Sequence, residues 1–230
     1  MSRSQQGLAG AGEWETLRKL LPDFKDKRVL DLGCGYGWHC IYAMENGASS
    51  VVGVDISHKM LEVAKEKTHF PQVEYKCCAI EDVEFPEESF DVILSSLAFH
   101  YVADYEILVK KIYRILKSGG KLVFTVEHPV FTAYGTQDWY YNEKGEILHF
   151  PVDNYYYEGK RTAVFLGEKV TKYHRTLTTY LNTLLSNGFI INHIVEPQPP
   201  ENMMDIPGMQ DEMRRPMMLI VSANKNCYTT

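Results

Sequence analysis

The 230-residue chain has no run of apolar residues approaching the roughly 20 that a membrane-spanning helix needs, so we expect no membrane association. Residues 1–12 are polar and glycine-rich and lack the apolar stretch of a secretory signal. We expect them to form a mobile leader that orders over a bound ligand. Cysteine is scarce: the five residues form no pair at metal-ligand spacing. An odd count without a secretory signal predicts reduced thiols in the cytoplasm and no metal site.

Positive charge is also limited. The 24 Lys and Arg residues are outnumbered by 30 Asp and Glu residues, which gives a formal net charge of −6. This balance argues against a large nucleic-acid footprint, so we expect no nucleic-acid partner. The length suits a single domain, residues 1–230, with room for an insertion. A monomer or loose homodimer is the default expectation.

Two apolar runs that each end in an acid are the most informative feature of the sequence. The segment 29–37 reads VLDLGCGYG, in which Asp31 precedes alternating glycines, and the run 51–55 ends in Asp55. Alternating glycines let the backbone turn sharply and approach a ligand closely. A carboxylate at the tip of the next strand can accept hydrogen bonds from ribose hydroxyls. The pattern therefore predicts a site for a nucleoside-type cofactor at the end of a parallel sheet.

The identity of that cofactor depends on Asp31. In the usual dinucleotide pattern a third glycine follows the second by three residues, but position 38 is Trp. A carboxylate just before the glycines would also repel a pyrophosphate, whereas it suits an ammonium group. We therefore favour S-adenosylmethionine, with S-adenosylhomocysteine as product, over a dinucleotide.

In the loop at 29–37 and in Asp55, the chain resembles the class I S-adenosylmethionine-dependent methyltransferases, especially the small-molecule type 11 group. Segments 85–94 (FPEESFDVIL) and 116–122 (LKSGGKL) also resemble that family. The match covers about residues 28–128 in the expected order. Three later segments are similar to a bacterial subgroup and extend the resemblance over nearly the whole chain: Glu127–Pro129, Tyr173–Thr176 and Glu196–Pro199.

Apolar periodicity predicts an α/β fold in which strands alternate with helices, which implies right-handed crossovers and a parallel sheet. Strands are expected at 27–32, 50–55, 73–78, 90–95, 121–127, 188–195 and 217–223. Helices are expected at 13–21, 37–46, 57–67, 105–117 and 171–186. Gly119 and Gly120 should end the fourth helix, whose buried face we assign to Ile107, Leu108, Ile112, Ile115 and Leu116. The resemblance implies a Rossmann-like, seven-stranded, mostly parallel sheet with helices on both faces and a final antiparallel pair.

The alternation stops at residues 129–170, which are rich in Tyr, Phe and Trp among polar residues and glycines. We interpret this segment as an insertion that folds over the sheet edge as a substrate cap, followed by a loop rich in Pro and Met at 198–215. Trp139 and Tyr156 are candidate substrate contacts. The alternative is that the aromatic side chains form only a small core within the cap.

The resemblance implies roles for the residues that match family motifs. Asp31 and the loop at Gly33, Cys34, Gly35 and Gly37 would hold the methionine end of the cofactor. Cys34 is also explained as a small residue that fits a tight turn. Asp55 would hold the ribose and Ile56 would pack on adenine. Ile80, with Glu81 or Asp82, would reach the adenine edge, because Ala79 stands where relatives have an acid. Ser95 and Ser96 would lie beside the sulfonium.

Methyl transfer needs mainly alignment and exclusion of water, and a general base only when the acceptor arrives protonated. His100, His128 and His174 are candidate bases or substrate ligands, since imidazole titrates near neutrality. The alternative for each is a structural histidine that caps backbone groups at a strand end. Arg175 is a candidate clamp for a substrate carboxylate, unless it pairs with Glu127 or Glu196.

The sequence thus favours a methyltransferase that acts on an O or N atom of a small molecule. One alternative is an RNA or protein methyltransferase, although residues 95–98 read SSLA in place of the Asn/Asp-Pro-Pro-aromatic motif typical of adenine N6 and glutamine methyltransferases. The other alternative is a regulatory protein that binds S-adenosylmethionine without turnover.

Overall fold

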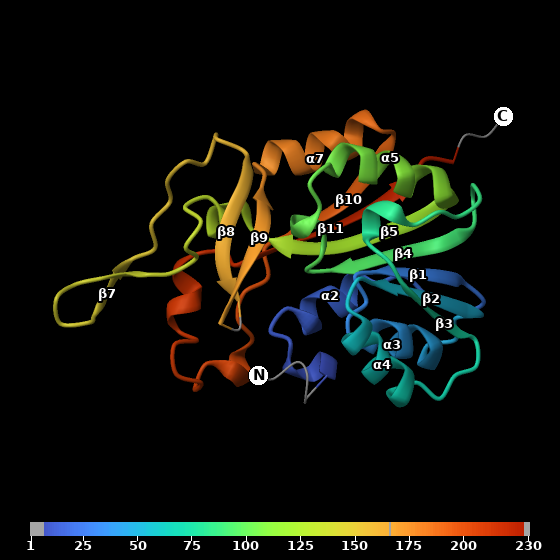
Figure 1. Ribbon diagram of the computed structural model, residues 1–230, viewed down its shortest axis with the longest axis horizontal. Helices are drawn as coiled ribbons and strands as arrows, with labels where there is room; N and C mark the ends of the chain where they lie inside the picture. Colours follow the sequence, from blue (N-terminus) through green and yellow to red (C-terminus); the bar gives the residue numbers. More distant parts are fainter. Residues whose placement is uncertain (1–6, 166, 228–230) are drawn as a thin grey trace.

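A seven-stranded sheet forms the centre of the computed structural model, which describes residues 7–165 and 167–227 (Figure 1). Its strands are β1 (Arg28–Leu32), β2 (Ser50–Asp55), β3 (Val73–Cys77), β4 (Phe90–Ser96), β5 (Leu116–Glu127), β10 (Phe189–Val195) and β11 (Met218–Lys225). They lie in the order β10-β11-β5-β4-β1-β2-β3. Strands β1 to β5 pair in parallel, and β11 is antiparallel to both of its neighbours. The predicted Rossmann-like sheet with a final antiparallel pair is confirmed.

Helices cover both faces of this sheet, as predicted (Figure 1). One face carries α2 (Trp14–Leu20), α3 (Trp38–Glu45) and α4 (His58–Lys67), and the other carries α5 (Tyr105–Ile115) and α7 (Leu177–Ser186). Two buried clusters correspond to the two faces, one containing Ile112 and Leu184 and the other Trp14 and Leu61. Burial of these apolar side chains supplies most of the driving force for layering helices on the sheet.

The end predicted for the helix over residues 105–117 was wrong. Helix α5 begins as expected, because the Asp104 carboxylate caps the N–H of Ile107, but it ends at Ile115. Residues 116–120 belong to β5, which is irregular in its pairing with β4 at this point. Ile107 is 59% exposed, so its assignment to the buried face was also wrong.

Among the described residues of the segment 129–165 and 167–174, the chain forms one short helix and two pairs of antiparallel strands. Helix α6 (Pro129–Thr132) is followed by the small hairpin β6 (Tyr140–Tyr141) and β7 (Ile147–His149), then by the hairpin β8 (Gly159–Phe165) and β9 (Glu168–His174). We call residues 133–158, which carry β6 and β7, the arm, because they project from the body in Figure 1.

A helix over 171–186 was therefore predicted with the wrong start. Residues 171–174 end strand β9, where Lys172 and His174 are buried and Tyr173 between them is less so. This is the period-2 pattern of a strand. Helix α7 begins only after Thr176, whose side chain caps the N–H of Thr179.

Of the expected leader, residues 1–6 lie outside the described residues. Gly7–Gly10 form a 3₁₀ turn, η1, and Ala11 is buried. Within the described ranges, no helix combines the length and apolarity required to cross a bilayer.

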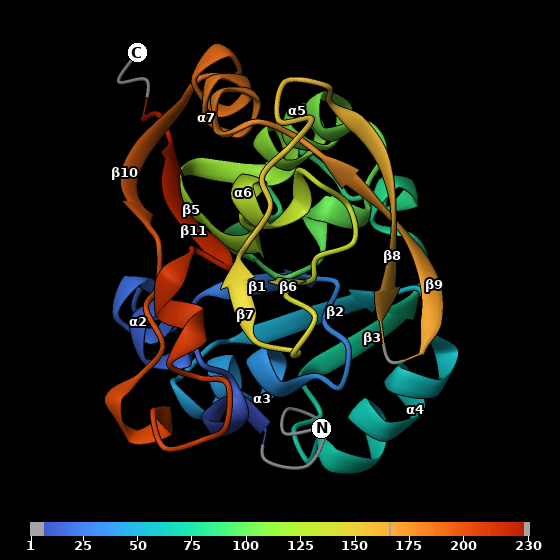
Figure 2. The same ribbon diagram turned by 90° about the vertical axis from the view of Figure 1, so that its left-hand side faces the viewer.

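The candidate functional residues and the longest loops lie at one edge of the sheet. Parallel strands β1 to β5 all end there, and antiparallel β11 begins there. The arm and residues 196–217, here called the methionine–proline loop, lie on this side, which faces the viewer in Figure 2. That loop contains the turns η4 (Glu201–Met203) and η5 (Asp211–Arg214). Two further 3₁₀ turns follow sheet strands: η2 (Ile80–Asp82) after β3 and η3 (Phe99–Tyr101) after β4.

Candidate functional site

The glycine loop after β1 is held tightly against neighbouring strands. The N–H groups of Gly33 and Cys34 both donate to the Val54 carbonyl, at 2.8 and 2.9 Å. Gly33 has φ +79°, and a Cβ there would lie 2.3 Å from the Cβ of Ala98. A Cβ at Gly37, with φ +75°, would lie 2.2 Å from the Tyr75 hydroxyl. Both positions therefore require glycine for conformation and for space.

Asp55, at the end of β2, is oriented by the backbone. Its Oδ2 accepts a hydrogen bond from the Gly35 N–H and its Oδ1 one from the Ser57 N–H, both at 2.8 Å. An ionised carboxylate can accept about four hydrogen bonds, so each oxygen keeps capacity for a ligand hydroxyl.

Asp31, at the end of β1, is buried, with 1% of its surface exposed. Its Oδ2 lies 3.5 Å from the Cys40 thiol, while its Oδ1 has no hydrogen-bond partner among the described residues. Burial raises the pKa of Asp31 to about 7, and the nearby Asp55 charge adds to this rise. A buried carboxyl oxygen without a partner is costly unless a cation or donor binds it. The site is therefore suited to an ammonium group.

The neighbouring positions are mostly open to solvent. Ile56 follows Asp55 directly and is 74% exposed. Ile80, which begins η2, lies beside the glycine loop, since a Cβ at Gly33 would be 3.5 Å from its Cδ1. Glu81 and Asp82 in the same turn are exposed. Cys34 is buried, with its sulfur against Gly53, where a Cβ would come within 2.9 Å of it.

The two serines at the end of β4 differ in their surroundings. Ser95 is buried, and its hydroxyl donates to the Leu32 carbonyl at 2.7 Å. Ser96 is partly exposed, and its Oγ lies 3.4 Å from the Thr125 Oγ1. Leu97 follows with φ +54°, a left-handed conformation that is uncommon for leucine and often found near functional sites. Nothing in the sequence signalled this strained position.

His100 and His128 are both buried near the end of β5. The Nδ1 of His100 lies 3.4 Å from the Glu127 N–H, and burial lowers the pKa of His100 to about 4. His128 caps α6, because its Nδ1 accepts the Val130 N–H at 3.1 Å. Its Nε2 lies 2.8 Å from a carboxylate oxygen of Glu196, and burial lowers its pKa.

His174 and Arg175 are fully engaged with protein groups. His174 lies at the end of β9, not at a helix start, with Nδ1 2.7 Å from the Thr132 hydroxyl and Nε2 2.9 Å from the Tyr155 carbonyl. Burial lowers the pKa of His174. The Arg175 guanidinium donates to the carbonyls of Val102 and Ala103. The guanidinium pairs with neither Glu127 nor Glu196, the two carboxylates that the sequence suggested as partners.

A polar cluster at the end of β5 was missed by sequence analysis. The Lys172 Nζ donates to the Glu127 Oε1 at 2.5 Å and to the Gln137 Oε1 at 2.8 Å, and the Gln137 amide donates to the Glu127 Oε2 at 2.6 Å. Only 3% of the Lys172 side chain is exposed. The cluster joins β9 and the arm to the end of β5. A strand assignment for residues 171–174 would have placed Lys172 and His174 on the same buried face.

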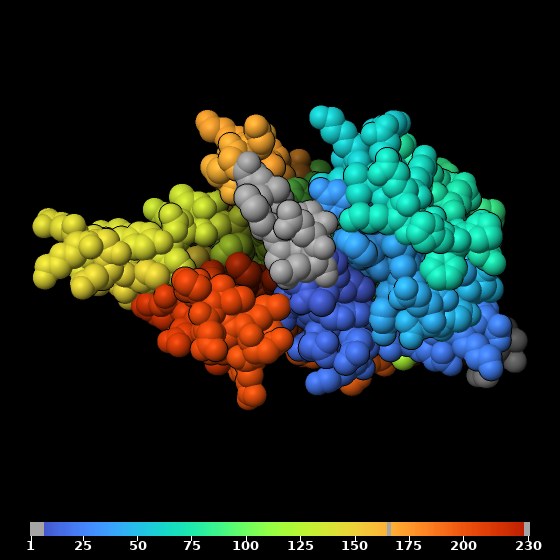
Figure 3. Space-filling model, turned by 90° about the horizontal axis from the view of Figure 1, so that it is seen from below, coloured from blue at the N-terminus to red at the C-terminus, as the bar shows by residue number. Residues whose placement is uncertain are grey.

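The two aromatic candidates lie in different places. Trp139 is half-buried and contributes to the wall of a cavity of about 670 Å³ beside the methionine–proline loop. Tyr156 is 87% exposed and is not part of that wall. Figure 3 shows this loop, in orange-red, between the yellow arm and the blue N-terminal elements.

Comparison with known proteins agrees with this arrangement. The family model described as "Methyltransferase domain" matches residues 30–124. A solved structure of a putative S-adenosylmethionine-dependent methyltransferase from Listeria monocytogenes is 58% identical, covers 96% of this chain and 99% of its own, and has a TM-score of 0.92. An S-adenosylmethionine-dependent methyltransferase from Mesorhizobium loti is 40% identical, covers 95% and 100% respectively, and has a TM-score of 0.88. A Haemophilus influenzae protein without an assigned function is 35% identical, over 93% of this chain and 87% of its own length.

Proposed function

The chain belongs to the S-adenosylmethionine-dependent methyltransferases, and on that basis we propose that it methylates an oxygen or nitrogen atom of a small molecule. Binding of the methyl donor is supported chiefly by one observation, the pair of carboxylates that Asp31 and Asp55 place on either side of the glycine loop. Binding of a small-molecule acceptor is supported by the cavity beside the same sheet edge.

The residues present fit the methyl donor. The unpartnered Oδ1 of Asp31 would bind its ammonium group, and the two oriented oxygens of Asp55 would accept its ribose hydroxyls. The exposed Ile56 side chain would pack on adenine, with Ile80, Glu81 and Asp82 at the far edge of the base. When bound, the donor supplies a methyl group on a sulfonium that leaves as a neutral thioether. The chain's own contribution is to align the two reactants and exclude water.

We propose that Ser95 and Ser96 form the floor beneath the reacting atoms mainly through the backbone. The Ser95 hydroxyl is bonded to β1, and the left-handed Leu97 turns the chain away directly afterwards. This placement leaves the space above the ends of β4 and β5 for the acceptor.

We further propose that the three histidines and Arg175 hold the walls of the site and that none of them transfers a proton. Both ring nitrogens of His174 and the Nδ1 of His128 are hydrogen-bonded within the protein, and the Nε2 of His128 lies 2.8 Å from the Glu196 carboxylate. The low pKa of His100 makes it a weak base. The Arg175 guanidinium faces backbone carbonyls. The acceptor would then be a group that is already nucleophilic near neutral pH, such as an amine that is unprotonated at that pH or an ionised oxygen.

A small acceptor is favoured over RNA by the net charge of −6, which would oppose approach of a polyanion. A cavity of about 670 Å³ with side-chain walls suits a small molecule better than it suits a protein surface.

Calorimetry with S-adenosylmethionine, S-adenosylhomocysteine and NAD tests the donor site. We expect both sulfur compounds to bind and NAD not to bind. Binding of NAD alone would contradict the proposed roles of Asp31 and Asp55.

Turnover is tested separately with a panel of amines, phenols and carboxylic acids, an RNA pool and a peptide pool, with S-adenosylhomocysteine release as readout. Product from a small molecule supports the proposal. Product from RNA or peptide alone would favour a macromolecular substrate. Donor binding without product from any acceptor would favour a non-catalytic regulatory protein.

A further inference from the structure

The carboxyl group of Asp31 lies where little stabilises a negative charge. Only 1% of the residue is exposed. Its Oδ1 has no hydrogen-bond partner among the described residues, and its Oδ2 has the Cys40 thiol, a weak donor, at 3.5 Å. No ion pair within the described ranges brings a cation to this carboxyl group. Because a buried charge without a partner is costly, the protonated carboxyl is the favoured form of the ligand-free chain at mildly acidic pH.

The titratable groups that interact with Asp31 supply no positive charge. Burial raises the pKa of the Cys40 thiol in α3 and of the Tyr75 hydroxyl in β3. A hydrogen bond with Cys40 opposes the same rise at Cys34, but burial prevails and the pKa of Cys34 is also raised. All three groups therefore stay neutral below about pH 8. Asp55, at the end of β2, carries a like charge and further disfavours ionisation of Asp31.

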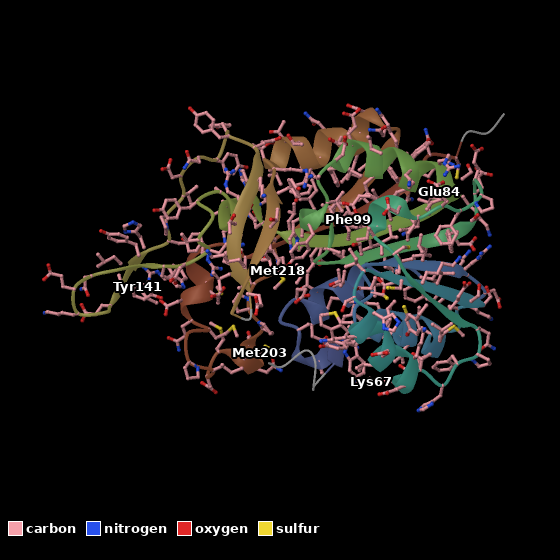
Figure 4. The ribbon with its side chains drawn as sticks, in the orientation of Figure 1. Lys67, Glu84, Phe99, Tyr141, Met203 and Met218 are labelled. Atoms are coloured by element: carbon pink, nitrogen blue, oxygen red, sulfur yellow. The ribbon has the colours of Figure 1, made fainter. Side chains whose placement is uncertain are left out.

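The remaining elements around Asp31 carry one cation and two further titratable groups. Strand β4 places Leu94, which does not titrate, beside Asp31. Lys67, at the end of α4, lies below the sheet in Figure 4, and its Nζ is 4.2 Å from the centre of an aromatic ring of α3. Glu13, which precedes α2, and His39 in α3 also titrate. A variant of Asp31 itself is therefore needed to assign a pH effect to this carboxyl group.

An ammonium group at Oδ1 would reverse the preference of Asp31 for its neutral form. An opposite charge in contact with a carboxyl group favours the ionised state. The ammonium keeps its own protons, so the proton that Asp31 held must pass to the solvent. Burial raises the pKa of Asp31 to about 7 in the ligand-free chain, which places this exchange in the neutral range. Neutral carboxyl and ammonium thus become a carboxylate–ammonium pair and one free proton.

We propose that binding of the methyl donor is coupled to release of a proton from Asp31, so that the chain loses affinity for the donor as the pH falls below neutrality. This inference rests on the proposed function, because it requires an ammonium group at Oδ1. The ionised carboxyl is the form that binds. Affinity is therefore complete above about pH 7 and falls by up to about tenfold for each pH unit below it. Asp31 would make loading of the donor a pH-sensitive step.

Calorimetry of the full chain with S-adenosylhomocysteine counts the protons. This ligand has the ammonium group of the donor but cannot transfer a methyl group during the titration. Each titration is made in two buffers that differ in ionisation enthalpy. We expect release of about 0.9 proton per ligand at pH 6 and about 0.1 at pH 8, and an affinity at least about tenfold weaker at pH 5.5 than at pH 7.5. Equal binding enthalpies in the two buffers at pH 6 would overturn the inference.

A matched ligand locates the proton at the ammonium end of the site. 5′-Methylthioadenosine has the base, the ribose and a thioether but no ammonium group. We expect it to bind without proton release at pH 6, with an affinity that changes by less than about threefold between pH 5.5 and 7.5. Proton release equal to that of S-adenosylhomocysteine would place the titrating group elsewhere in the site and so contradict the inference.

Two variants assign the proton to Asp31. Asp31→Asn keeps the shape of the side chain but cannot titrate, so it should bind S-adenosylhomocysteine more weakly at pH 7.5 and release no proton at pH 6. Glu87→Gln neutralises an exposed acid outside the site and should release as many protons as the wild type. An Asp31→Asn chain that still releases a proton would assign the effect to another group, such as Glu13 or His39, and would refute the inference.

The two ligands decide the matter on the wild-type chain if Asp31→Asn does not fold. Binding of S-adenosylhomocysteine without proton release at pH 6 contradicts the inference alone. A chain that binds neither S-adenosylhomocysteine nor 5′-methylthioadenosine contradicts the proposed function.

Discussion

The carboxylate of Asp55 holds the backbone N–H of Gly35 at 2.8 Å, so the tip of β2 and the loop after β1 form one unit. The Ser57 N–H fixes the second carboxylate oxygen at the same distance. Both oxygens are thus oriented before any ligand arrives. Removal of this carboxylate would release the N–H of Gly35 in the glycine loop and, under the proposed function, would also remove an acceptor for the ribose.

Asp55→Ala is expected to weaken S-adenosylhomocysteine binding by about 1.5–3 kcal/mol, the range for hydrogen bonds to a charged group. Calorimetry measures the change. Glu87→Ala, which removes an exposed acid away from the site, serves as the control and should not alter affinity. Equal affinities of the Asp55 variant and the wild type would refute the ribose role.

Asp31 should make the ligand-free protein less stable as the pH rises. Its pKa is raised from 3.8 to about 7 on folding, so its favourable contribution is complete below pH 3.8 and is lost as the pH rises through 7. Between pH 5 and 7 the free energy of unfolding should fall by about 2 kcal/mol relative to Asp31→Asn, which does not titrate. Urea unfolding of both proteins at pH 5, 6 and 7 measures the difference. Parallel pH profiles would contradict the raised pKa.

His100 should have the opposite pH dependence. Its pKa is lowered on folding from 6.5 to about 4, so its contribution is present above pH 6.5 and is lost as the pH falls through 4. The loss amounts to about 3 kcal/mol over that window. Comparison of the wild type with His100→Gln by urea unfolding at pH 4, 5 and 6.5 checks this. A wild-type profile no steeper than that of His100→Gln would show that His100 titrates normally.

The ion pair of Lys172 and Glu127 should be sensitive to loss of one partner. Lys172→Met leaves the Glu127 carboxylate partly buried without its cation and is expected to destabilise the fold by about 3–5 kcal/mol. The double variant Lys172→Met, Glu127→Gln should recover part of that loss, because no unpaired charge remains. Urea unfolding of the single and double variants measures it. A double variant as unstable as the single one would mean that packing, not charge, dominates.

His174 joins α6 to the arm through Thr132 and Tyr155. His174→Ala should therefore lower the free energy of unfolding by about 1–3 kcal/mol, the cost of leaving buried partners unsatisfied, and spare S-adenosylhomocysteine affinity. His69→Ala, at an exposed position, is the matched control. Once an acceptor is known, unchanged stability with lost turnover would instead identify His174 as a base.

The sequence predicted the elements of the first half of the fold well, because that half is built from contiguous signals. The run ending in Asp31, the glycines and the run ending in Asp55 each specify a strand, a turn or a helix start locally. The acceptor side depends on contacts between distant segments. Lys172 meets Glu127 across 45 residues, and Arg215 lies over the rings of Trp139 and Phe150 in the arm. No local pattern indicates such contacts. The start of α7 was misplaced because residues 171–174 end strand β9, where Lys172 and His174 share the buried face.

Strand β11 runs antiparallel to both β5 and β10, so the loop that precedes it, and not the one that follows, lies at the edge where β1 to β5 end. The residues proposed to bind the donor lie before residue 100, whereas the cavity is lined mainly by segments after residue 128, with residues 10–13 as the exception. Substitutions and length changes in residues 196–217 can accumulate without disturbing Asp31, Asp55 or the glycine loop. In evolutionary terms, the chain can change its acceptor while keeping its methyl donor.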